Sequence, residues 1–552
     1  MSEITRRGFV KGAALAAPLA ITPFNMAQTS STPRYDVVVV GAGHNSLITA
    51  CYLAKAGFKC LVLEGRPKIG GGTKTAQLTL SGFHHDVCSS IHGFIQTNPL
   101  MRNNELKLEE YGLEYIYPDP VYHIAFPDGS YITKWRDLDR TCQEIAKYSK
   151  KDAETWHRMA IESEPIRNIV DEVGFTPIGF GKSLGERLAE HPQGKLWQRR
   201  MAMSKLEILR QNFEDERTMV AVMPPFPKLI SAPTTGFAGY PLKQDDVPQP
   251  KGGSGMIATA LSRFLEGHGG EVLVNKPVER LIVENGRCTG VECADGSSYH
   301  AEKAVLSTVH IKQLVHMAPR DLWPEDFIEG VNTFNTGAGS FNSHFATTEP
   351  LKFPVKGGTI VPVHISNIPS CKRALRFESE LALGEFHVEE PVLHIVQTSV
   401  ADPTRAPAGM HTIRVLCEQA VYDLPDGGPG RWEEIKAEVQ QAHLKAVQKI
   451  APNLTDDKIL ARMSMSPVDI EQMNPAMWHG SCHGGTDGPA QAGAMRPVPG
   501  WAQHRMPIPG LYQTGGTTHP GGGVSGGPGR NAAVVMLKDF GTSMEETLSK
   551  KG

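Results

Sequence analysis

A chain of 552 residues exceeds what one hydrophobic core usually serves, so we expect two or more domains with a large buried interior. Hydrophobic residues make up 40% and charged residues 21% of the chain, which is the balance of a globular protein and excludes a disordered one. The net charge of -3 excludes the basic excess of a nucleic-acid binder.

The first 33 residues predict an export signal followed by a linker. Arg6 and Arg7 precede a mild apolar stretch over residues 12–27, which two prolines interrupt. This order resembles a twin-arginine signal, whose export machinery carries folded proteins, and the stretch is too short to span a bilayer comfortably. We therefore expect an exported or periplasmic protein, either free or membrane-associated.

Residues 34–64 predict a strand, a helix and a second strand. Four consecutive valines in residues 34–41 indicate a strand buried on both faces, as in a parallel sheet. An apolar helix over residues 46–56 and a strand over residues 59–64 complete a βαβ unit. The sequence thus predicts an α/β fold with a Rossmann-type nucleotide-binding domain.

The turn within this unit predicts a dinucleotide site. Its residues are Gly41, Ala42, Gly43, His44, Asn45 and Ser46. Gly41 allows the tight turn, and Gly43 lets the backbone approach a pyrophosphate at the helix N-terminus. Ser46 stands where a third glycine is usual, which predicts slightly wider helix packing. Glu64 ends the second strand, where its carboxylate can accept hydrogen bonds from ribose.

The run after Glu64 distinguishes FAD from NAD. It contains Gly65, Arg66, Gly70, Gly71, Gly72 and Thr73. Its glycines allow a loop to run against the diphosphate and ribityl chain, and Arg66 can pair with ribose or phosphate oxygens. NAD dehydrogenases lack such a run, so FAD is favoured and an NAD-dependent dehydrogenase is the alternative.

A second glycine system lies near the end of the chain. It contains Gly515, Gly516, Gly522, Gly523 and Val524, between an apolar strand and an apolar helix over residues 532–537. Flexible linkers do not normally interrupt packed elements, so we expect a loop against the flavin. His519 in this loop is the candidate catalytic base, and the alternative is a histidine that holds the loop.

The middle of the chain predicts a discontinuous architecture. A helix over residues 255–267 precedes strands over 271–274, 278–284 and 288–293, which we expect to form a meander, and a last strand over 304–307. The FAD-binding domain is expected to comprise residues 34–100, 251–310 and 456–552. An α+β substrate or cap domain, residues 101–250 and 311–455, is expected to be inserted into it.

Two groups of cysteines and histidines are assigned structural roles. Cys288 and Cys293 have the spacing of a flavin-linked disulfide, but five positions apart in one strand they should face opposite sides. His479, Cys482 and His483 lack a distant partner cluster, so we expect a cofactor-lining loop and no metal site.

These motifs resemble a known family. The fingerprint from Gly41, residues 81–92, residues 252–257 and the His519 loop together resemble the phytoene-desaturase-like flavoproteins, in particular the branch called pyridine nucleotide-disulphide oxidoreductase domain-containing protein 2. The resemblance implies FAD as cofactor and assigns Val278 to backbone contacts with adenine.

The expected activity follows from the flavin. We expect an FAD-dependent dehydrogenase, desaturase or oxidase that transfers hydride from a C–H bond of an apolar or alicyclic small molecule to flavin N5. Oxygen, a quinone or another carrier would then reoxidise the flavin. A flavin-binding protein without turnover, acting through partners, is the alternative of another class. Residues 223–240 are interpreted as a pocket lining or a packed loop, and the oligomeric state stays open.

Overall fold

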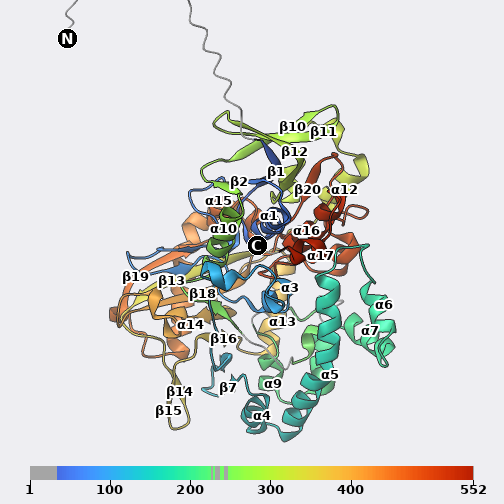
Figure 1. Cartoon of the computed structure of the whole chain (residues 1–552). Coiled ribbons are helices and arrows are strands. Elements are labelled where there is room, and N and C mark those ends of the chain that lie inside the picture. Colours follow the sequence, from blue (N-terminus) through green and yellow to red (C-terminus); the bar gives the residue numbers. More distant parts are fainter. Residues whose placement is uncertain (1–33, 225–227, 231–236, 242–246, 551–552) are drawn as a thin grey trace, which may run out of the picture. The chain divides into compact units, whose positions relative to one another are not determined.

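Two seven-stranded sheets organise the part of the chain that the structure describes (Figure 1). The computed structural model describes residues 34–224, 228–230, 237–241 and 247–550. The predicted export signal over residues 1–33 lies outside these ranges. Within them, no helix combines the length and the apolar character that crossing a membrane requires.

The first sheet has the strand order β10-β11-β12-β1-β2-β9, and β20 also pairs with β12. Its strands are β1 (Tyr35–Val40), β2 (Cys60–Leu63), β9 (Glu271–Leu273), β10 (Val278–Glu284), β11 (Arg287–Cys293), β12 (Ser298–Ser307) and β20 (Leu511–Gln513). β1 pairs in parallel with both β2 and β12, and these pair in parallel with β9 and β20 respectively. The predicted α/β class and Rossmann-type sheet are confirmed.

The predicted meander is wrong for one strand. β10, β11 and β12 pair antiparallel, with a turn at Asn285 and Gly286 between β10 and β11, but β9 adds in parallel to the far side of β2. β9 follows directly after helix α10 (Met256–Gly267). A strand reached through a helix ordinarily joins a sheet in parallel, whereas a two-residue turn pairs its strands antiparallel.

Helices cover one face of the first sheet. They are α1 (His44–Ala56), α10, α16 (Gly527–Asp539) and α17 (Met544–Ser549). Val37 and Val39 share a core with these helices, whereas Val38 and Val40 share another core with β10, β11, α11 (Ile311–Leu314) and α12 (Glu325–Thr333). Because strand side chains alternate, burial on both faces explains the four consecutive valines of β1.

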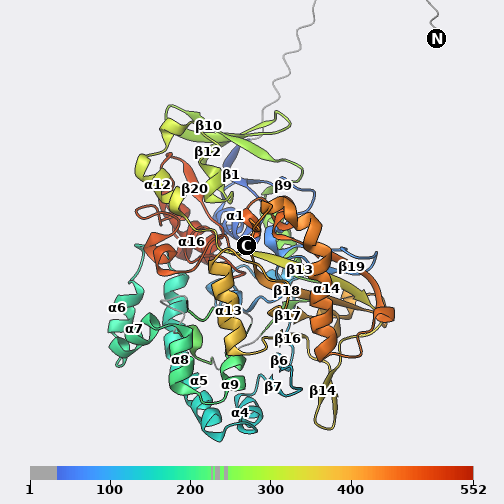
Figure 2. The same cartoon turned by 180° about the vertical axis from the view of Figure 1, so that it is seen from behind.

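The second sheet has the order β19-β13-β18-β17-β16-β6-β7. Its strands are β6 (Tyr122–Ala125), β7 (Tyr131–Lys134), β13 (Gly339–Thr347), β16 (His364–Asn367), β17 (Leu393–Val396), β18 (His411–Ala420) and β19 (Ile459–Met465). Helix α14 (Trp432–Ile450) packs on one face (Figure 2). There the rings of Phe341 and Trp432 lie 5.6 Å apart. The other face is free to line a cavity.

The predicted domain limits stay a prediction, because the described chain from Tyr35 onward forms one unit. Two elements fall on the other side of those limits. β19 belongs to the second sheet although residues 456–552 are expected in the FAD-binding domain. The helices α11 and α12 pack in the core of the first sheet although residues 311–455 are expected in the cap domain.

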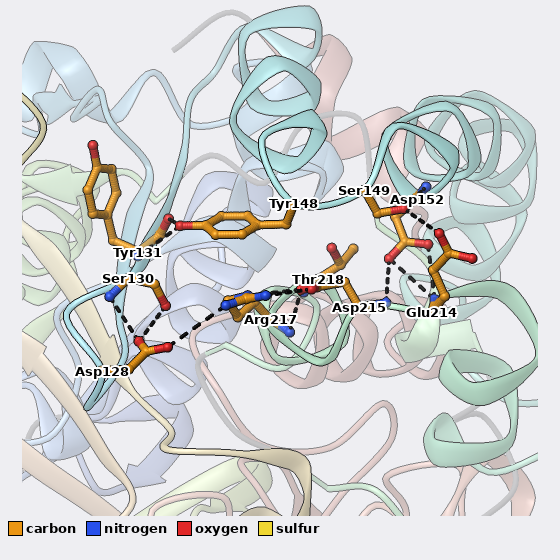
Figure 3. A network of polar contacts seen from close by, with 10 residues as sticks. All are labelled: Asp128, Ser130, Tyr131, Tyr148, Ser149, Asp152, Glu214, Asp215, Arg217 and Thr218. Atoms are coloured by element: carbon orange, nitrogen blue, oxygen red, sulfur yellow. Dashed lines mark hydrogen bonds and ion pairs between the residues drawn. The ribbon is translucent and has the colours of Figure 1, made fainter.

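A helical region is fixed to the second sheet by a polar network (Figure 3). Its helices are α4 (Leu138–Ala146), α5 (Lys150–Gly174), α6 (Leu184–Ala189), α7 (Gly194–Ala202), α8 (Lys205–Asn212) and α9 (Glu216–Ala221). Arg217 pairs with Asp215 at 2.8 Å and lies 4.3 Å from the ring centroid of Tyr148. The hydroxyl of Tyr148 donates to the carbonyl of Tyr131 in β7 at 2.9 Å, which reaches the second sheet. Asp152 accepts hydrogen bonds from the backbone N–H groups of Glu214 and Asp215, which joins α5 to the start of α9.

The remaining elements are short or peripheral. They are the strand pairs β3 (Thr75–Ala76) with β4 (His85–Asp86), β5 (Tyr115–Ile116) with β8 (Gln249–Pro250), and β14 (Phe353–Val355) with β15 (Gly358–Ile360), and the helices α2 (Gly93–Gln96), α3 (Pro99–Arg102), α13 (Cys371–Ala382) and α15 (Pro467–Met473).

Candidate functional site

A cavity of about 760 Å³ lies where the carboxyl ends of β1, β2, β12 and β20 meet one face of the second sheet. Ligands of open α/β sheets commonly bind at this edge. Most of the predicted cofactor residues line the cavity, namely Gly41, Gly43, His44, Asn45, Ser46, Glu64, Gly65, Arg66, Gly71, Gly72, Thr73, Val278, Gly515, Gly516, Gly522, Gly523 and Val524. Ala42 and Gly70 do not line it, because they pair with each other beneath its surface.

The turn after β1 has the shape that the sequence predicts. Gly41 has a φ of +92°, and a Cβ there would lie 2.3 Å from the hydroxyl of Thr308. A Cβ on Gly43 would meet nothing within 4 Å, so this glycine leaves open space at the start of α1. Ser46 is fully buried and its hydroxyl donates toward the carbonyls of Gly41 (2.6 Å) and Gly43 (3.0 Å). The serine therefore braces the turn, a role that its position in the motif does not predict.

Glu64 is fixed to the same turn. Its Oε2 accepts a hydrogen bond from the N–H of Ala42 (3.0 Å) and its Oε1 accepts one from the N–H of Arg66 (2.9 Å). Both oxygens keep further lone pairs for a ribose hydroxyl. The guanidinium of Arg66 donates to the carbonyl of Gln472, so its predicted pairing with ribose or phosphate stays a prediction.

The following glycines pack a loop against the turn. The N–H of Gly70 donates to the carbonyl of Ala42 at 2.8 Å. A Cβ on Gly71 would lie 3.2 Å from the Cα of Gly43, and one on Gly72 would lie 2.4 Å from the methyl group of Met477. Side chains at these positions would push the loop away, which explains why glycines follow one another here.

The C-terminal glycine loop meets the first turn. His44 hydrogen-bonds to the backbone of Gly523, and burial lowers the pKa of His44 to about 4. The loop is held from behind by Arg496, which is 1% exposed and donates to the carbonyl of Gly516. A Cβ on Gly522 would lie 2.0 Å from the carbonyl oxygen of His483. The two distant glycine systems thus form one site.

His519 is not placed as the predicted catalytic base. It does not line the cavity, and its Nε2 lies 3.2 Å from the carbonyl of Val173 in the last turn of α5. Burial lowers its pKa, so the ring is neutral at pH 7. The catalytic role stays a prediction, and this geometry favours the alternative that His519 holds the loop to α5.

One face of the second sheet forms the opposite wall. His394 and Val396 of β17 and Arg414, Leu416 and Glu418 of β18 line the cavity at alternate positions. The intervening residues of these strands belong to the core beneath α14. Sequence reasoning missed this wall, although the alternation of polar and apolar residues in β18 is the signal of a two-faced strand.

Comparison with known proteins decides the family. The model of the family described as flavin containing amine oxidoreductase matches residues 47–537. The chain belongs to this family.

Its relatives are distant and span nearly the whole chain. Pyridine nucleotide-disulfide oxidoreductase domain-containing protein 2 of Mus musculus is 25% identical over 92% of this chain and 94% of its own length. A limonene dehydrogenase chain of Castellaniella defragrans is 26% identical over 93% and 96%. A neurosporene-forming phytoene desaturase of Cereibacter sphaeroides is 24% identical over 92% and 96%.

Two solved structures show the same fold. Putrescine oxidase bound to putrescine matches with a TM-score of 0.59 at 14% identity, covering 92% of this chain and 99% of its own. Cyclohexylamine oxidase from Brevibacterium oxydans matches with a TM-score of 0.55 at 15% identity, covering 92% and 100%. Together with the family, these neighbours identify FAD as the cofactor and the chain as an oxidoreductase.

The residues of the cavity fit FAD. The open space at Gly43 admits the pyrophosphate, the buried Glu64 carboxylate suits a ribose, and the Nε2 of His44 is buried without a hydrogen-bond partner among the described residues. Val278 lines the cavity at the start of β10, and its contact with adenine stays a prediction. When bound, FAD supplies a two-electron acceptor.

A buried network positions the loop that carries Ser89. Asp86 accepts hydrogen bonds from the hydroxyl of Thr75 and the N–H of Ser254, both at 2.8 Å. The hydroxyl of Ser254 in turn lies 2.5 Å from Ser89 Oγ and 2.7 Å from His92 Nε2. These residues belong to the motifs over residues 81–92 and 252–257, so the role of those motifs is to fix the cavity edge against the start of α10.

Of the loop over residues 479–483, Ser481, Cys482 and His483 line the cavity as predicted, whereas His479 does not. The Nε2 of His483 lies 3.4 Å from Glu418, and the ring of His479 stacks on Tyr422 at 4.3 Å. Although burial alone would lower the pKa of His483, its hydrogen bond to the carboxylate of Glu418 raises it. Cys482 lies 3.4 Å from the hydroxyl of Ser340, and the neighbouring Cys88 and Ser340 lower the pKa of its thiol.

The expectation that Cys288 and Cys293 face opposite sides of their strand is wrong. Both thiols are unpaired, but they share one hydrophobic core. β11 carries a bulge, because Val283 faces Cys288 and Ile282 faces Gly290. The extra residue interrupts the alternation that the sequence reading assumes.

Proposed function

We propose that this chain is an FAD-dependent dehydrogenase, desaturase or oxidase of the phytoene-desaturase-like type, which removes hydride from a C–H bond of a small molecule with an apolar or alicyclic body. The carrying observation is a single cavity that joins the glycine loops for FAD to the apolar side chains of Ile91, Val396 and Leu416. Such a lining buries an apolar substrate and excludes water from the reacting carbon.

The names of the relatives support this chemistry. Limonene and phytoene are the compounds named in two relatives, and cyclohexylamine and putrescine are named in the structural neighbours. Limonene and cyclohexylamine share a six-membered ring, and phytoene is a long hydrocarbon. Putrescine is a polar diamine, but it is named only in a structural neighbour of 14% identity, whereas the compounds named in the two relatives are hydrocarbons. An apolar body next to the flavin is therefore favoured over a strongly polar one.

The Glu418 and His483 pair can hold a proton at the cavity wall. Glu418 lines the cavity and raises the pKa of His483, so the neutral imidazole is a stronger proton acceptor and the carboxylate stabilises the imidazolium that forms. A proton released from the substrate after hydride loss needs such an acceptor. We assign this pair, rather than His519, as the proton-handling group.

Anaerobic flavin reduction tests the proposal. Purified protein is mixed with limonene, cyclohexylamine, cyclohexanol and cyclohexenone, and the flavin absorption near 450 nm is followed. Bleaching by at least one compound, followed by reoxidation with oxygen or a quinone, is the expected result. A yellow protein that no compound in a broad panel bleaches would favour a flavin-binding protein without turnover, and a colourless protein would favour an NAD-dependent dehydrogenase.

A further inference from the structure

The cavity wall contains a buried guanidinium whose hydrogen bonds are incomplete. Arg414 is 5% exposed and lines the cavity from β18. Its Nε donates to the side-chain oxygen of Asn342 at 2.9 Å and its Nη1 to the hydroxyl of Ser90 at 3.3 Å. Its Nη2 is buried and has no hydrogen-bond partner in the described part of the chain.

The acidic groups around Arg414 are committed elsewhere. Glu418, four residues along the same strand, pairs with His483, and Asp86 pairs with Arg405 at 2.9 Å. No carboxylate of the described residues forms an ion pair with Arg414. A buried charge without a partner is costly, and hydrogen bonds to neutral oxygens leave the positive charge itself uncompensated.

The imidazoles next to Arg414 add hydrogen-bond donors to this wall but no positive charge. His394 lines the same wall, and His344 lies near Arg414 on the adjacent strand β13. Burial lowers the pKa of both imidazoles well below the usual value, so both are neutral at pH 7. Arg414 therefore carries the positive charge on this wall.

We propose that Arg414 anchors a carboxylate of the substrate, with the apolar body of the substrate lying along Val396 and Leu416 toward the flavin. The proposal rests on the proposed function, because it names the substrate class of the same site. The substrate is then an apolar or alicyclic carboxylic acid rather than a plain hydrocarbon or an amine.

The other cations of the cavity favour a singly charged anion. Lys276 pairs with Asp295 at 2.6 Å, and Arg167 lies 3.9 Å from the carboxylate of Asp171. Arg66 donates to a backbone carbonyl on the cofactor side. A phosphate monoester, with about two charges, would need several cations close together. One guanidinium edge beside the neutral donor His394 matches a carboxylate better.

Ligand binding tests the proposal without turnover. The FAD-loaded protein is titrated with cyclohexanecarboxylate, benzoate and octanoate, each against its primary amide, by calorimetry and by the visible flavin spectrum. At least one acid should bind about 10- to 100-fold more tightly than its amide, because a buried hydrogen bond to a charged group contributes a binding free energy of that size. R414M should remove this difference, and R414K should restore part of it.

The control variant is R462M, which removes an exposed arginine from β19 of the same sheet and should leave the acid affinity unchanged. Unfolding midpoints and FAD content show whether each variant is folded and loaded. The proposal is overturned if acids and amides bind equally, if no acid binds to the loaded protein, or if folded R414M keeps the acid affinity. It is also overturned if folded R414M loses FAD, because Arg414 would then serve the cofactor.

The two proposals fail separately. If neutral apolar compounds bleach the flavin while acids show no preference, the proposed function stands and the carboxylate anchor falls. If acids bind through Arg414 but no acid or neutral compound bleaches the flavin, the anchor stands and the proposed oxidoreductase activity on apolar bodies falls.

Discussion

The guanidinium of Arg496 donates to the carbonyl of Gly516 through both Nε (3.1 Å) and Nη2 (2.5 Å). Its Nη1 donates to the carbonyl of Thr486 at 2.6 Å. Burial lowers the pKa of Arg496 to about 10, so the group stays charged at neutral pH. One charged side chain thus fixes the loop that completes the FAD site from behind.

R496M should lower both stability and FAD content. The substitution leaves several buried carbonyls without donors, which should cost about 3 kcal/mol in free energy of unfolding. Urea unfolding of the apoprotein and flavin absorption of the purified protein measure the two effects. R280M, at an exposed arginine of β10, should change neither. Wild-type stability in R496M would contradict the assigned role.

Alanine substitutions at two glycines of the first turn should have different effects on FAD affinity and on stability. G43A adds a Cβ in open space with an ordinary backbone conformation, so the apoprotein should fold normally and lose FAD affinity at least about tenfold. G41A puts a Cβ at a φ of +92° and against Thr308, so the apoprotein itself should be destabilised by about 2 kcal/mol or more. Differential scanning fluorimetry with and without added FAD separates the two. Equal FAD binding by G43A and wild type would contradict the placement of the pyrophosphate.

The cofactor half of the site could be predicted because its signals are local. The turn at Gly43 and the carboxylate of Glu64 belong to one βαβ unit, whose geometry follows from chain spacing. The valines of β1 likewise report burial on both faces. These parts depend on short-range physics that a single sequence displays.

The substrate half could not be predicted, because it depends on which sheet face meets the flavin. Arg414 and His394 occupy positions that a strand pattern assigns to an exposed face, and only the packing of α14 on the opposite face turns them inward. The position of His519 in the glycine loop predicts a place beside the flavin, whereas its hydrogen-bond partner Val173 lies 346 residues away in the sequence. Contacts of that range leave no trace in local spacing.

H519Q should leave catalysis nearly intact. His519 contacts the end of α5 and not the cavity, so the rate of flavin reduction should stay within about threefold of wild type, whereas loss of a general base costs about 100-fold or more. A loss of about 1 kcal/mol in free energy of unfolding is expected from the broken hydrogen bond. Stopped-flow reduction with a substrate found in the panel provides the rate. A loss of about 100-fold in a folded, FAD-loaded variant would restore the catalytic role.

His92 should make stability depend on acid pH. It is fully buried, with Nε2 at 2.7 Å from Ser254 Oγ and Nδ1 at 3.0 Å from Tyr115 OH, and burial lowers its pKa to about 3. Between pH 6.5 and pH 3 the unfolded chain takes up a proton that the folded chain refuses. The free energy of unfolding therefore falls by about 1.4 kcal/mol per pH unit as the pH drops through this range.

H92Q should remove that part of the slope, which urea unfolding at half-unit steps from pH 7 to pH 4 measures. H300Q, at an exposed position of β12, is the matched control and should keep the wild-type slope. An unchanged slope in H92Q would show that His92 does not contribute to the acid sensitivity.

Export should depend on the paired arginines. Replacing Arg6 and Arg7 together by lysine keeps the charge but removes the pair that the twin-arginine machinery reads. Cell fractionation should find the wild type in the exported fraction with FAD bound and the double variant inside the cell, also with FAD bound. K11R is a control that should leave the distribution unchanged. An exported double variant would exclude this route.

The hydrogen bond between His44 and Gly523 joins the beginning and the end of the described chain across the cofactor site. A ribosome must therefore synthesise residues 515–524 before FAD has a complete place to bind. A nascent chain that holds only the first glycine turn offers FAD half of its site, so loading of the cofactor follows the synthesis of the second glycine loop.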